Sequence, residues 1–348
     1  MRTFERVAVA AVALLGVLAA LAHFDHWATL VAFVLATLAL AGMAWIVSLG
    51  TDQTGEHLGT AATGLLQATL GNLPELFVVI FALRAGEHEV AQSAIVGSLF
   101  ATSMLVLGLV LIVGALSARD GVMRFRASVA SDASTLLLVC VFIIVIVSFA
   151  LPGIGAGHVR TVSVVAAALL LTVYLAWVIP YVIRDQSAGA ARVSAARIAL
   201  PLALTLLAGA GVGAAFVSDW FVDALAPAIH QLHISQAFAG LVIVALASNA
   251  VEHVTGIALA ARGRSDLAIS VVINSVAQIA AFLFPALVLI SLSVHTSLTF
   301  SLRPVYIGAL AVSAFGIWKI TEDGEGHPYE GWALVATYVV LAMITLYE

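Results

Sequence analysis

The chain of 348 residues is 63% apolar and only 9% charged, and its mean hydropathy is +1.14. No water-soluble fold of this length can bury such a large apolar fraction, so the composition excludes a soluble enzyme or binding domain. The net charge of −5 is spread thinly and forms no basic patch, which excludes a nucleic-acid-binding protein.

Apolar runs long enough to cross a bilayer follow one another along the whole chain, since a spanning helix needs about 20 apolar residues. We expect eleven spans, at about 4–22, 27–49, 58–84, 88–116, 128–150, 159–183, 196–217, 234–262, 266–293, 299–320 and 331–347. The runs are continuous and rich in Leu, Ala and Val, whereas barrel strands alternate between apolar and polar residues. The sequence therefore predicts an all-α, polytopic membrane protein.

Basic residues are divided unequally between the loops on the two sides of these spans. If the N-terminus lies inside, the inner segments hold Arg2, Arg6, Arg119, Arg124, Arg126, Arg184, Arg192, Arg197, Arg262, Arg264 and Lys319. The outer segments hold Arg84, Arg160 and Arg303. This bias predicts a protein of the cell (inner) membrane with a cytoplasmic N-terminus and an external C-terminus. The first span, with two arginines before an apolar stretch, also fits a signal peptide.

Polar residues inside the apolar runs recur at one constant offset, which equals the separation of Glu75 from Glu252. The other matches are Asn72 with Asn249, Gly86 with Gly263, Glu89 with Asp266, Ser93 with Ser270, and Ser98 with Ser275. We therefore expect an N-terminal helix at 1–26, a five-helix repeat at 27–183, a cytoplasmic linker at 184–195 and a second repeat at 196–348. An odd number of spans inverts the second repeat, as in secondary transporters.

Glu75 and Glu252 lie deep in apolar segments, where an unpaired charge costs at least about 2.5–3.5 kcal/mol. Each is either protonated or functional, since no Lys or Arg lies in the core of any span. We expect the two carboxylates to face each other and to bind a hard cation such as Ca²⁺ through oxygen. A carboxylate in a low-dielectric site also binds a proton more tightly than in water, so the same groups can exchange the cation for protons.

The residues around the glutamates fit a cation site. Gly71 and Pro74 lie inside a span and predict a helix break that exposes carbonyl groups, whereas the segment before Glu252 has neither residue and is less expected to unwind. The side chains and backbone expected to line the site are Gly71, Asn72, Ser98, Thr102, Asn249, Ser275 and Gln278. His253 is either a proton shuttle or a hydrogen-bonded helix residue.

Two stretches resemble the Ca²⁺/cation antiporter superfamily, specifically its Ca²⁺/H⁺ antiporter (CAX) branch. The first runs from Gly64 to Leu76 and on through Ser98 to Gly108, and the second runs from Asn249 to Thr255, followed by Asp266 and Gln278. The resemblance implies that the acidic residue of each repeat, here Glu75 and Glu252, binds Ca²⁺ and protons alternately. It also implies that Asn72, Asn249, Ser98, Ser275 and Gln278 line the site.

The chain departs from that family in ways that bear on ion preference and regulation. Ser248 and Asn274 replace glycines of the second repeat, and Thr102 stands where the first repeat usually has Asn. The acidic cytosolic helix of some members has no counterpart in residues 184–195.

The same sequence features also fit other functions of membrane proteins. The same fold serves Na⁺/Ca²⁺ exchangers and monovalent cation/H⁺ antiporters, and a pair of carboxylates also suits a cation channel, although channels usually use rings of charge. An intramembrane hydrolase is disfavoured because Glu87-His88-Glu89 lacks the His-Glu-x-x-His spacing. We therefore expect no enzyme activity and no cofactor, with transported Ca²⁺ and H⁺ and membrane lipid as partners.

Overall fold

The computed structural model describes residues 2–58, 70–187, 197–294 and 297–348. Within these ranges the chain forms two compact units. Unit 1 comprises residues 1–87, 175–234 and 247–251, and unit 2 comprises residues 88–174, 235–246 and 252–348. Both consist almost entirely of helices, which confirms the predicted all-α fold.

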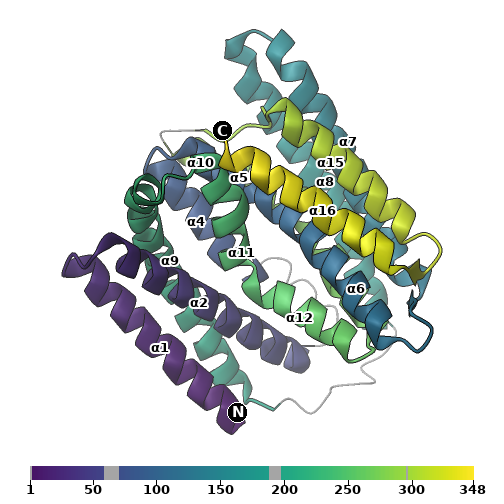
Figure 1. Ribbon diagram of the computed structural model, residues 1–348, viewed down its shortest axis with the longest axis horizontal. Coiled ribbons are helices and arrows are strands. Elements are labelled where there is room, and N and C mark those ends of the chain that lie inside the picture. Colours follow the sequence, from purple (N-terminus) through teal and green to yellow (C-terminus); the bar gives the residue numbers. More distant parts are fainter. Residues whose placement is uncertain (1, 59–69, 188–196, 295–296) are drawn as a thin grey trace. The chain divides into compact units, whose positions relative to one another are not determined.

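Unit 1 contains long helices joined by close packing at small residues. Its elements are α1 (Thr3–Phe24), α2 (Thr29–Leu58), α4 (Leu73–Arg84) and α9 (Leu200–Leu232). Helix α2 packs against α1 and α9, and α4 packs against α9; the first two helices lie side by side in Figure 1. A Cβ added at Gly42 would overlap Val12, so the missing side chain lets α1 and α2 approach closely.

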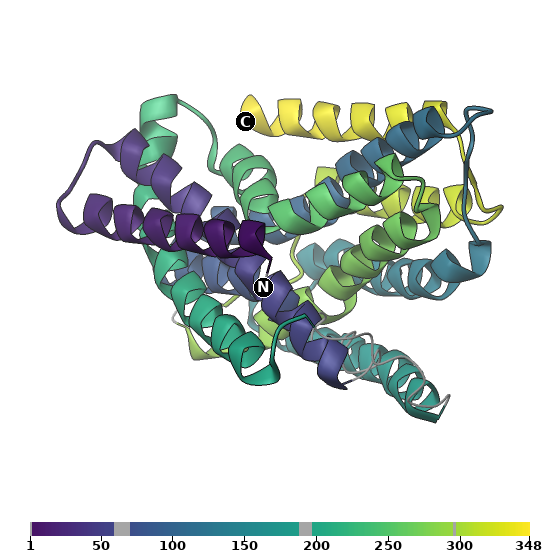
Figure 2. The same ribbon diagram turned by 90° about the horizontal axis from the view of Figure 1, so that it is seen from below.

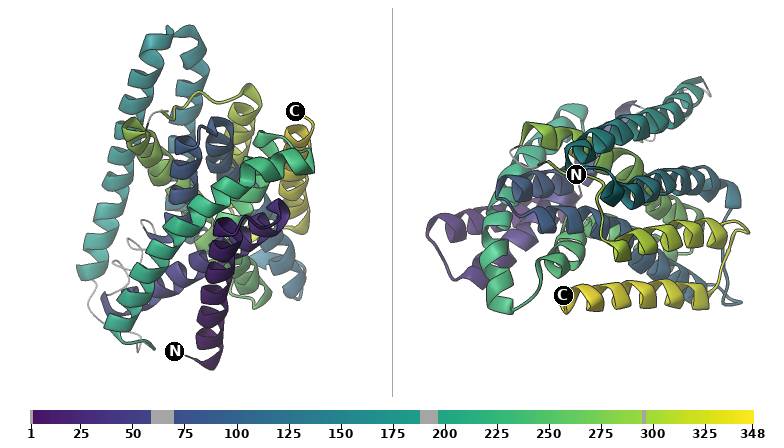
Figure 3. Two further views of the ribbon diagram at one scale, coloured as in Figure 1. Left: turned by 90° about the vertical axis from the view of Figure 1, so that its left-hand side faces the viewer. Right: turned by 90° about the horizontal axis from the view of Figure 1, so that it is seen from above.

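Unit 2 contains most of the remaining elements. Its α-helices are α5 (His88–Phe100), α6 (Leu107–Ser117), α7 (Ala127–Ala150), α10 (Gln236–Phe238), α13 (Ser265–Gln278), α14 (Phe284–Ile290), α15 (Pro304–Ile320) and α16 (Pro328–Leu346). Its π-helical segments are η2 (Ala101–Val106), η4 (Ala239–Val244) and η5 (Ile279–Leu283), and its 3-10 turns are η3 (Leu151–Gly153) and η6 (Ser291–Ser293). Its two short strands are β1 (Met123–Arg124) and β2 (Glu325–Gly326). Three helices continue from one unit into the other: α8 (Ala156–Ser187), α11 (Ala245–Ser248) and α12 (Ala250–Ala261). Figure 3 shows α7 and α8 joined by a short turn.

A short antiparallel ladder fixes the direction of two helices of unit 2. Met123 pairs with Gly326, so β1, which leads into α7, lies beside β2, which follows α15. Helices α7 and α15 pack against each other and therefore run antiparallel, with their N-termini at opposite ends of the unit. Helix α16 packs along α6 (Figure 2). Gly108 and Gly331 approach each other through their backbones, since a Cβ added at either would overlap the carbonyl oxygen of the other.

Helix bounds recur at the same offset that the sequence shows between Glu75 and Glu252. At this offset both ends of α12 coincide with those of α4, and the first residues of α13, α14 and α15 coincide with those of α5, α6 and α7. The recurrence supports two homologous halves, while the orientation of the complete halves and the boundaries expected for them stay predictions.

Most spans long and apolar enough to cross a bilayer agree with those expected, but two helices extend beyond the expected ends: α2 continues to Leu58 instead of 49, and α9 continues to Leu232 instead of 217. The described residues contain eight helices that are long and apolar enough, together with one bent pair, Gln236–Ser248 and Ala250–Ala261, and the shorter apolar helix α15. The expected third span, 58–84, lies partly outside the described residues. The structure describes its second part, which contains α4. The total of eleven spans therefore stays a prediction.

Candidate functional site

Glu75 lies in the first turn of α4, directly after a helix break in unit 1. Residues 70–71 form a π turn, residue 72 forms a turn, and α4 begins at Leu73 with Pro74 in its first turn. Proline suits that position because the first amides of a helix have no intrahelical partner. The Glu75 side chain is only 1% exposed, and the Asn249 Nδ2 donates a hydrogen bond to its Oε2 at 3.4 Å.

Two further predicted site residues lie at the same break. Gly71 is in the π turn, and Asn72 is the buried residue that precedes α4. Within the part of the chain that the structure describes, the Asn72 Oδ1 makes no hydrogen bond. A buried amide oxygen in that state is an available ligand for a cation.

The second helix break forms without glycine or proline, although the sequence predicts less unwinding at this segment than at the first. Asn249 is the single turn residue between α11 and α12, and the two segments on either side of it are bent by 64°. The Asn249 amide also donates to the Ser248 Oγ at 3.2 Å. Asn and Ser side chains compete with backbone hydrogen bonds, which explains a break at this position.

Glu252 lies in the first turn of α12 and is half-buried. The Ser275 Oγ, from α13, donates a hydrogen bond to the Glu252 Oε2. Both residues belong to unit 2, and the structure thus brings together a glutamate and a hydroxyl that the sequence placed in one site.

His253 contacts another predicted site residue in unit 2. Its Nε2 lies 3.2 Å from the Thr102 Oγ1, and both side chains are buried. The contact joins α12 to η2, across 151 residues of sequence. Ser98 lies fully buried on α5, one turn before Thr102, while Gln278 is half-buried at the end of α13.

Two π-helical segments near these residues, η2 and η5, were not expected from the sequence. Segment η2 begins at Ala101, after Ser98, and η5 begins at Ile279, after Ser275 and Gln278. A π segment widens a helix and redirects side chains, and such segments are frequent at functional sites. The propensities of these apolar runs contain no signal for them.

A polar cluster on α2 was also missed. Thr51, Gln53 and Thr54 are buried, and their side chains have no hydrogen-bond partner among the residues described. The sequence signal was the polar run from Thr51 to Glu56, which ended the expected second span at 49; the structure corrects this end, because α2 continues through the run to Leu58. Buried polar groups of this kind mark polar paths through membrane proteins.

Both glutamates receive hydrogen bonds from neutral donors. Asn249 contributes an amide to Glu75 and Ser275 contributes a hydroxyl to Glu252, whereas an arginine would neutralise a carboxylate. A carboxylate that accepts such a hydrogen bond keeps oxygen lone pairs that are able to bind either a hard cation or a proton. Glu75 lies in unit 1 and Glu252 in unit 2, and their facing each other stays a prediction.

Comparisons with known proteins place these segments in a family. The family described as "Sodium/calcium exchanger protein" matches residues 28–181 and 202–347. A vacuolar calcium ion transporter of Schizosaccharomyces pombe is 30% identical over 332 residues, covering 92% of this chain and 80% of the relative. A Ca²⁺/H⁺ antiporter of Aphanothece halophytica is 28% identical, covering 91% of this chain and 90% of the relative.

Solved structures agree with this assignment. The structure of native YfkE has a TM-score of 0.82 and 26% identity, and the match covers 98% of this chain and 99% of that one. The H⁺/Ca²⁺ exchanger CAX has a TM-score of 0.76 at 17% identity, with 99% and 93% covered, which shows the shared fold. The chain is therefore a member of the sodium/calcium exchanger protein family, which confirms the resemblance to the Ca²⁺/cation antiporters seen in its sequence.

Proposed function

We propose that this protein is a secondary transporter that exchanges Ca²⁺ for protons by alternating access, with Glu75 and Glu252 binding the cation and protons in turn. The observation that supports this most is the repeated local structure: in both segments a helix breaks, and a glutamate stands in the first turn of the helix that follows. Two such breaks at equivalent positions of a repeat match the design of secondary transporters.

The position of each glutamate accounts for binding of both ions. The N-terminus of a helix carries a partial positive charge, which stabilises a carboxylate in the first turn as an anion. Burial in an apolar span opposes that charge and favours the protonated form. Because the two effects oppose each other, a small change in proton concentration or in cation occupancy shifts the balance, as exchange requires.

The exchange cycle follows from this competition. On the side with more protons, the carboxylates are protonated and release the cation. On the other side they lose the protons and bind the cation through their oxygens, assisted by the Asn72 oxygen and the Ser98 and Ser275 hydroxyls. His253 relays protons through its contact with Thr102, and each form of the protein carries its ions across by exposing the site to one side at a time.

The choice of Ca²⁺ rests on relatives whose names specify that ion. The Aphanothece halophytica and Bacillus subtilis proteins, 28% and 27% identical to this chain, are named Ca²⁺/H⁺ antiporters. Calcium prefers six to eight oxygen ligands, and the carboxylate, amide and hydroxyl oxygens proposed for this site are of the kind that it binds. Sodium/calcium exchange is the alternative within this family.

The test is ⁴⁵Ca²⁺ uptake into proteoliposomes under an imposed pH gradient in Na⁺-free buffer. Wild type should accumulate Ca²⁺ in proportion to the gradient, and Glu75→Gln and Glu252→Gln should each abolish uptake. The matched control is Glu322→Gln, which removes an exposed carboxylate that pairs with Lys319 outside the spans and should leave uptake unchanged.

Each other outcome has a definite meaning. Uptake by wild type that requires Na⁺ rather than a proton gradient identifies a sodium/calcium exchanger. Gradient-dependent uptake that survives both glutamate substitutions refutes the carboxylate mechanism. Uptake that continues without any counter-ion indicates a channel.

A further inference from the structure

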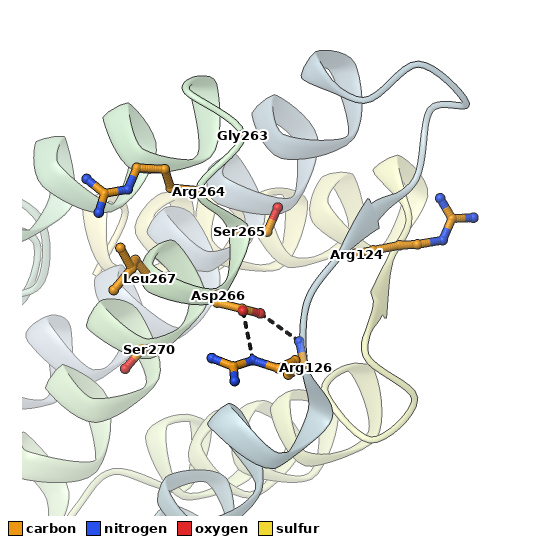
Figure 4. A pocket seen from close by; sticks show the side chains of 8 residues that line it. All are labelled: Arg124, Arg126, Gly263, Arg264, Ser265, Asp266, Leu267 and Ser270. Carbon is orange, nitrogen blue, oxygen red and sulfur yellow. Dashed lines mark hydrogen bonds and ion pairs between the residues drawn. The ribbon is translucent and has the colours of Figure 1, made fainter.

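A pocket of about 520 Å³ lies in unit 2, where the spans α7 and α13 begin. Its lining consists of Arg124, Arg126, Gly263, Arg264, Ser265, Asp266, Leu267 and Ser270 (Figure 4). Since α7 and α13 pack side by side and both start here, two helix N-termini with partial positive charge meet at one end of the unit. The pocket belongs to neither glutamate segment.

The charges in the pocket are arranged by one carboxylate. Asp266 accepts hydrogen bonds from the Arg126 backbone N–H at 2.7 Å and from the Arg126 Nε at 2.9 Å. Both carboxylate oxygens are thereby used, and the terminal nitrogens of Arg126 extend toward the Ser270 side of the pocket (Figure 4). Arg124 points away and pairs instead with Asp120 and Glu325. The cations available to a ligand are Arg126 and Arg264, both exposed.

The Arg126–Asp266 pair has a counterpart at the other end of unit 2. Each residue of the counterpart is separated from its equivalent in the first pair by the offset of the repeat. There Arg303, which precedes α15 as Arg126 precedes α7, pairs with Glu89 of α5 at 2.5 Å. Because α7 and α15 run antiparallel, the two pairs mark opposite ends of the unit. The two pairs thus share one structural role. One holds the start of α13 to the start of α7, and the other holds the start of α5 to the start of α15.

The surroundings of the two pairs differ in charge and polarity. Arg264 follows Gly263 in the turn before α13, whereas Glu87 holds the equivalent place after Gly86. Arg303 also pairs with a second carboxylate, that of Glu348. Leu267 at the pocket is 43% exposed, whereas its counterpart, Val90, is fully buried. Only the pocket end therefore combines a surplus of arginine with an exposed apolar side chain.

We propose that this pocket binds the phosphate group of an anionic membrane lipid. Arg126 and Arg264 supply the charge, Ser265 and Ser270 supply hydroxyl donors, and the amides at the start of α13 face the same anion. The pocket stands where two apolar spans begin, which is the level of the headgroups, and Leu267 contacts the acyl chains below. The ligand is a lipid rather than free phosphate because that apolar rim would otherwise face water.

The experiment measures binding without transport, so its result is independent of the proposed exchange of ions. Purified protein in detergent is titrated with short-chain phosphatidylglycerol, with short-chain phosphatidylcholine and with inorganic phosphate, and the thermal unfolding midpoint is followed. Wild type should be stabilised by phosphatidylglycerol alone. Arg264→Gln removes a cation without breaking the Asp266 pair and should weaken the lipid's apparent affinity by about fivefold, whereas Arg264→Lys should retain it.

Arg303→Gln is the matched control, because it breaks the equivalent ion pair at the other end. Arg303→Gln should lower the unfolding midpoint yet leave the response to phosphatidylglycerol unchanged. Arg126→Gln should lower the unfolding midpoint and also abolish the response to phosphatidylglycerol. Equal stabilisation by inorganic phosphate overturns the lipid assignment and assigns a free anion to the pocket. An unaltered lipid response in Arg264→Gln, or equal responses to the two lipids, refutes the site.

Discussion

A single methyl group at Gly97 should separate two helical segments of unit 2. An added Cβ would lie 2.5 Å from both the Leu241 Cα and the Leu241 carbonyl oxygen, which are backbone atoms of η4. Carbon atoms in contact normally stay about 3.5–4.0 Å apart. Since the obstructing atoms are backbone and no side chain can swing away, α5 and η4 must move apart by about 1 Å.

The structure sets the size of the effect. Helix α5 packs along η4, and a Cβ added at Gly240 of η4 would lie 2.7 Å from the Val90 carbonyl oxygen and 2.9 Å from the Ala94 amide nitrogen of α5. Moving the two segments apart loosens this whole seam, and overpacking of this kind costs about 1–3 kcal/mol. In a chain of this length that corresponds to a fall of about 2–6 °C in the unfolding midpoint.

The assay uses the buried Cys140 on α7, the single cysteine of the chain. A thiol-reactive fluorophore reports its exposure as the detergent-solubilised protein is heated. The matched control is Gly316→Ala, because an added Cβ there has no neighbour within 4 Å. That variant should unfold at the wild-type temperature or slightly above, since alanine favours helix more than glycine does.

One combination of results would refute the reasoning. If Gly97→Ala unfolds at the wild-type temperature and Gly316→Ala unfolds earlier, then close backbone packing between α5 and η4 does not limit stability. Transport by the same variants in proteoliposomes adds a second readout, because α5 carries Ser98 beside the substituted position.

Three further substitutions test individual contacts. Asn249→Ala removes the amide that contacts the first glutamate and should weaken Ca²⁺ affinity about tenfold in equilibrium ⁴⁵Ca²⁺ binding, since a hydrogen bond to a charged group contributes about 1.5–3 kcal/mol; unchanged binding would contradict it. Thr102→Val leaves the buried His253 without its hydroxyl partner and should destabilise the protein by about 1–3 kcal/mol in chemical unfolding, whereas Thr102→Ser should not. The hydrogen bond from Arg124 lowers the pKa of Asp120 below its ordinary 3.8, so this bridge stabilises the fold above that pH and is lost as the pH falls through the lowered pKa. Asp120→Asn should therefore lower the unfolding temperature slightly at neutral pH and not at pH values below that pKa, and an equal effect at both would exclude the bridge as its cause.

Much of the fold was readable because a bilayer imposes simple rules on sequence. Every backbone amide in the hydrocarbon must be bonded within its own helix, so continuous apolar runs translate directly into spans such as α7 and α16. The break before Glu75 was readable for a similar reason, since Pro74 cannot continue a helix. The break before Glu252 was not, because it depends on the side-chain bonds of Asn249, which only the packed structure provides.

Local patterns were enough to predict most helical spans, the offset of the repeat and the two glutamates that stand out as acids in apolar surroundings. Tertiary structure alone decided which groups meet: Ser275 with Glu252, and Arg126 with Asp266. The physical reason is that helix formation follows local composition, whereas the partner of a polar side chain depends on how helices distant in sequence pack together. The arginine pocket illustrates the difference, because its residues come from two turns about 140 residues apart that no local pattern connects.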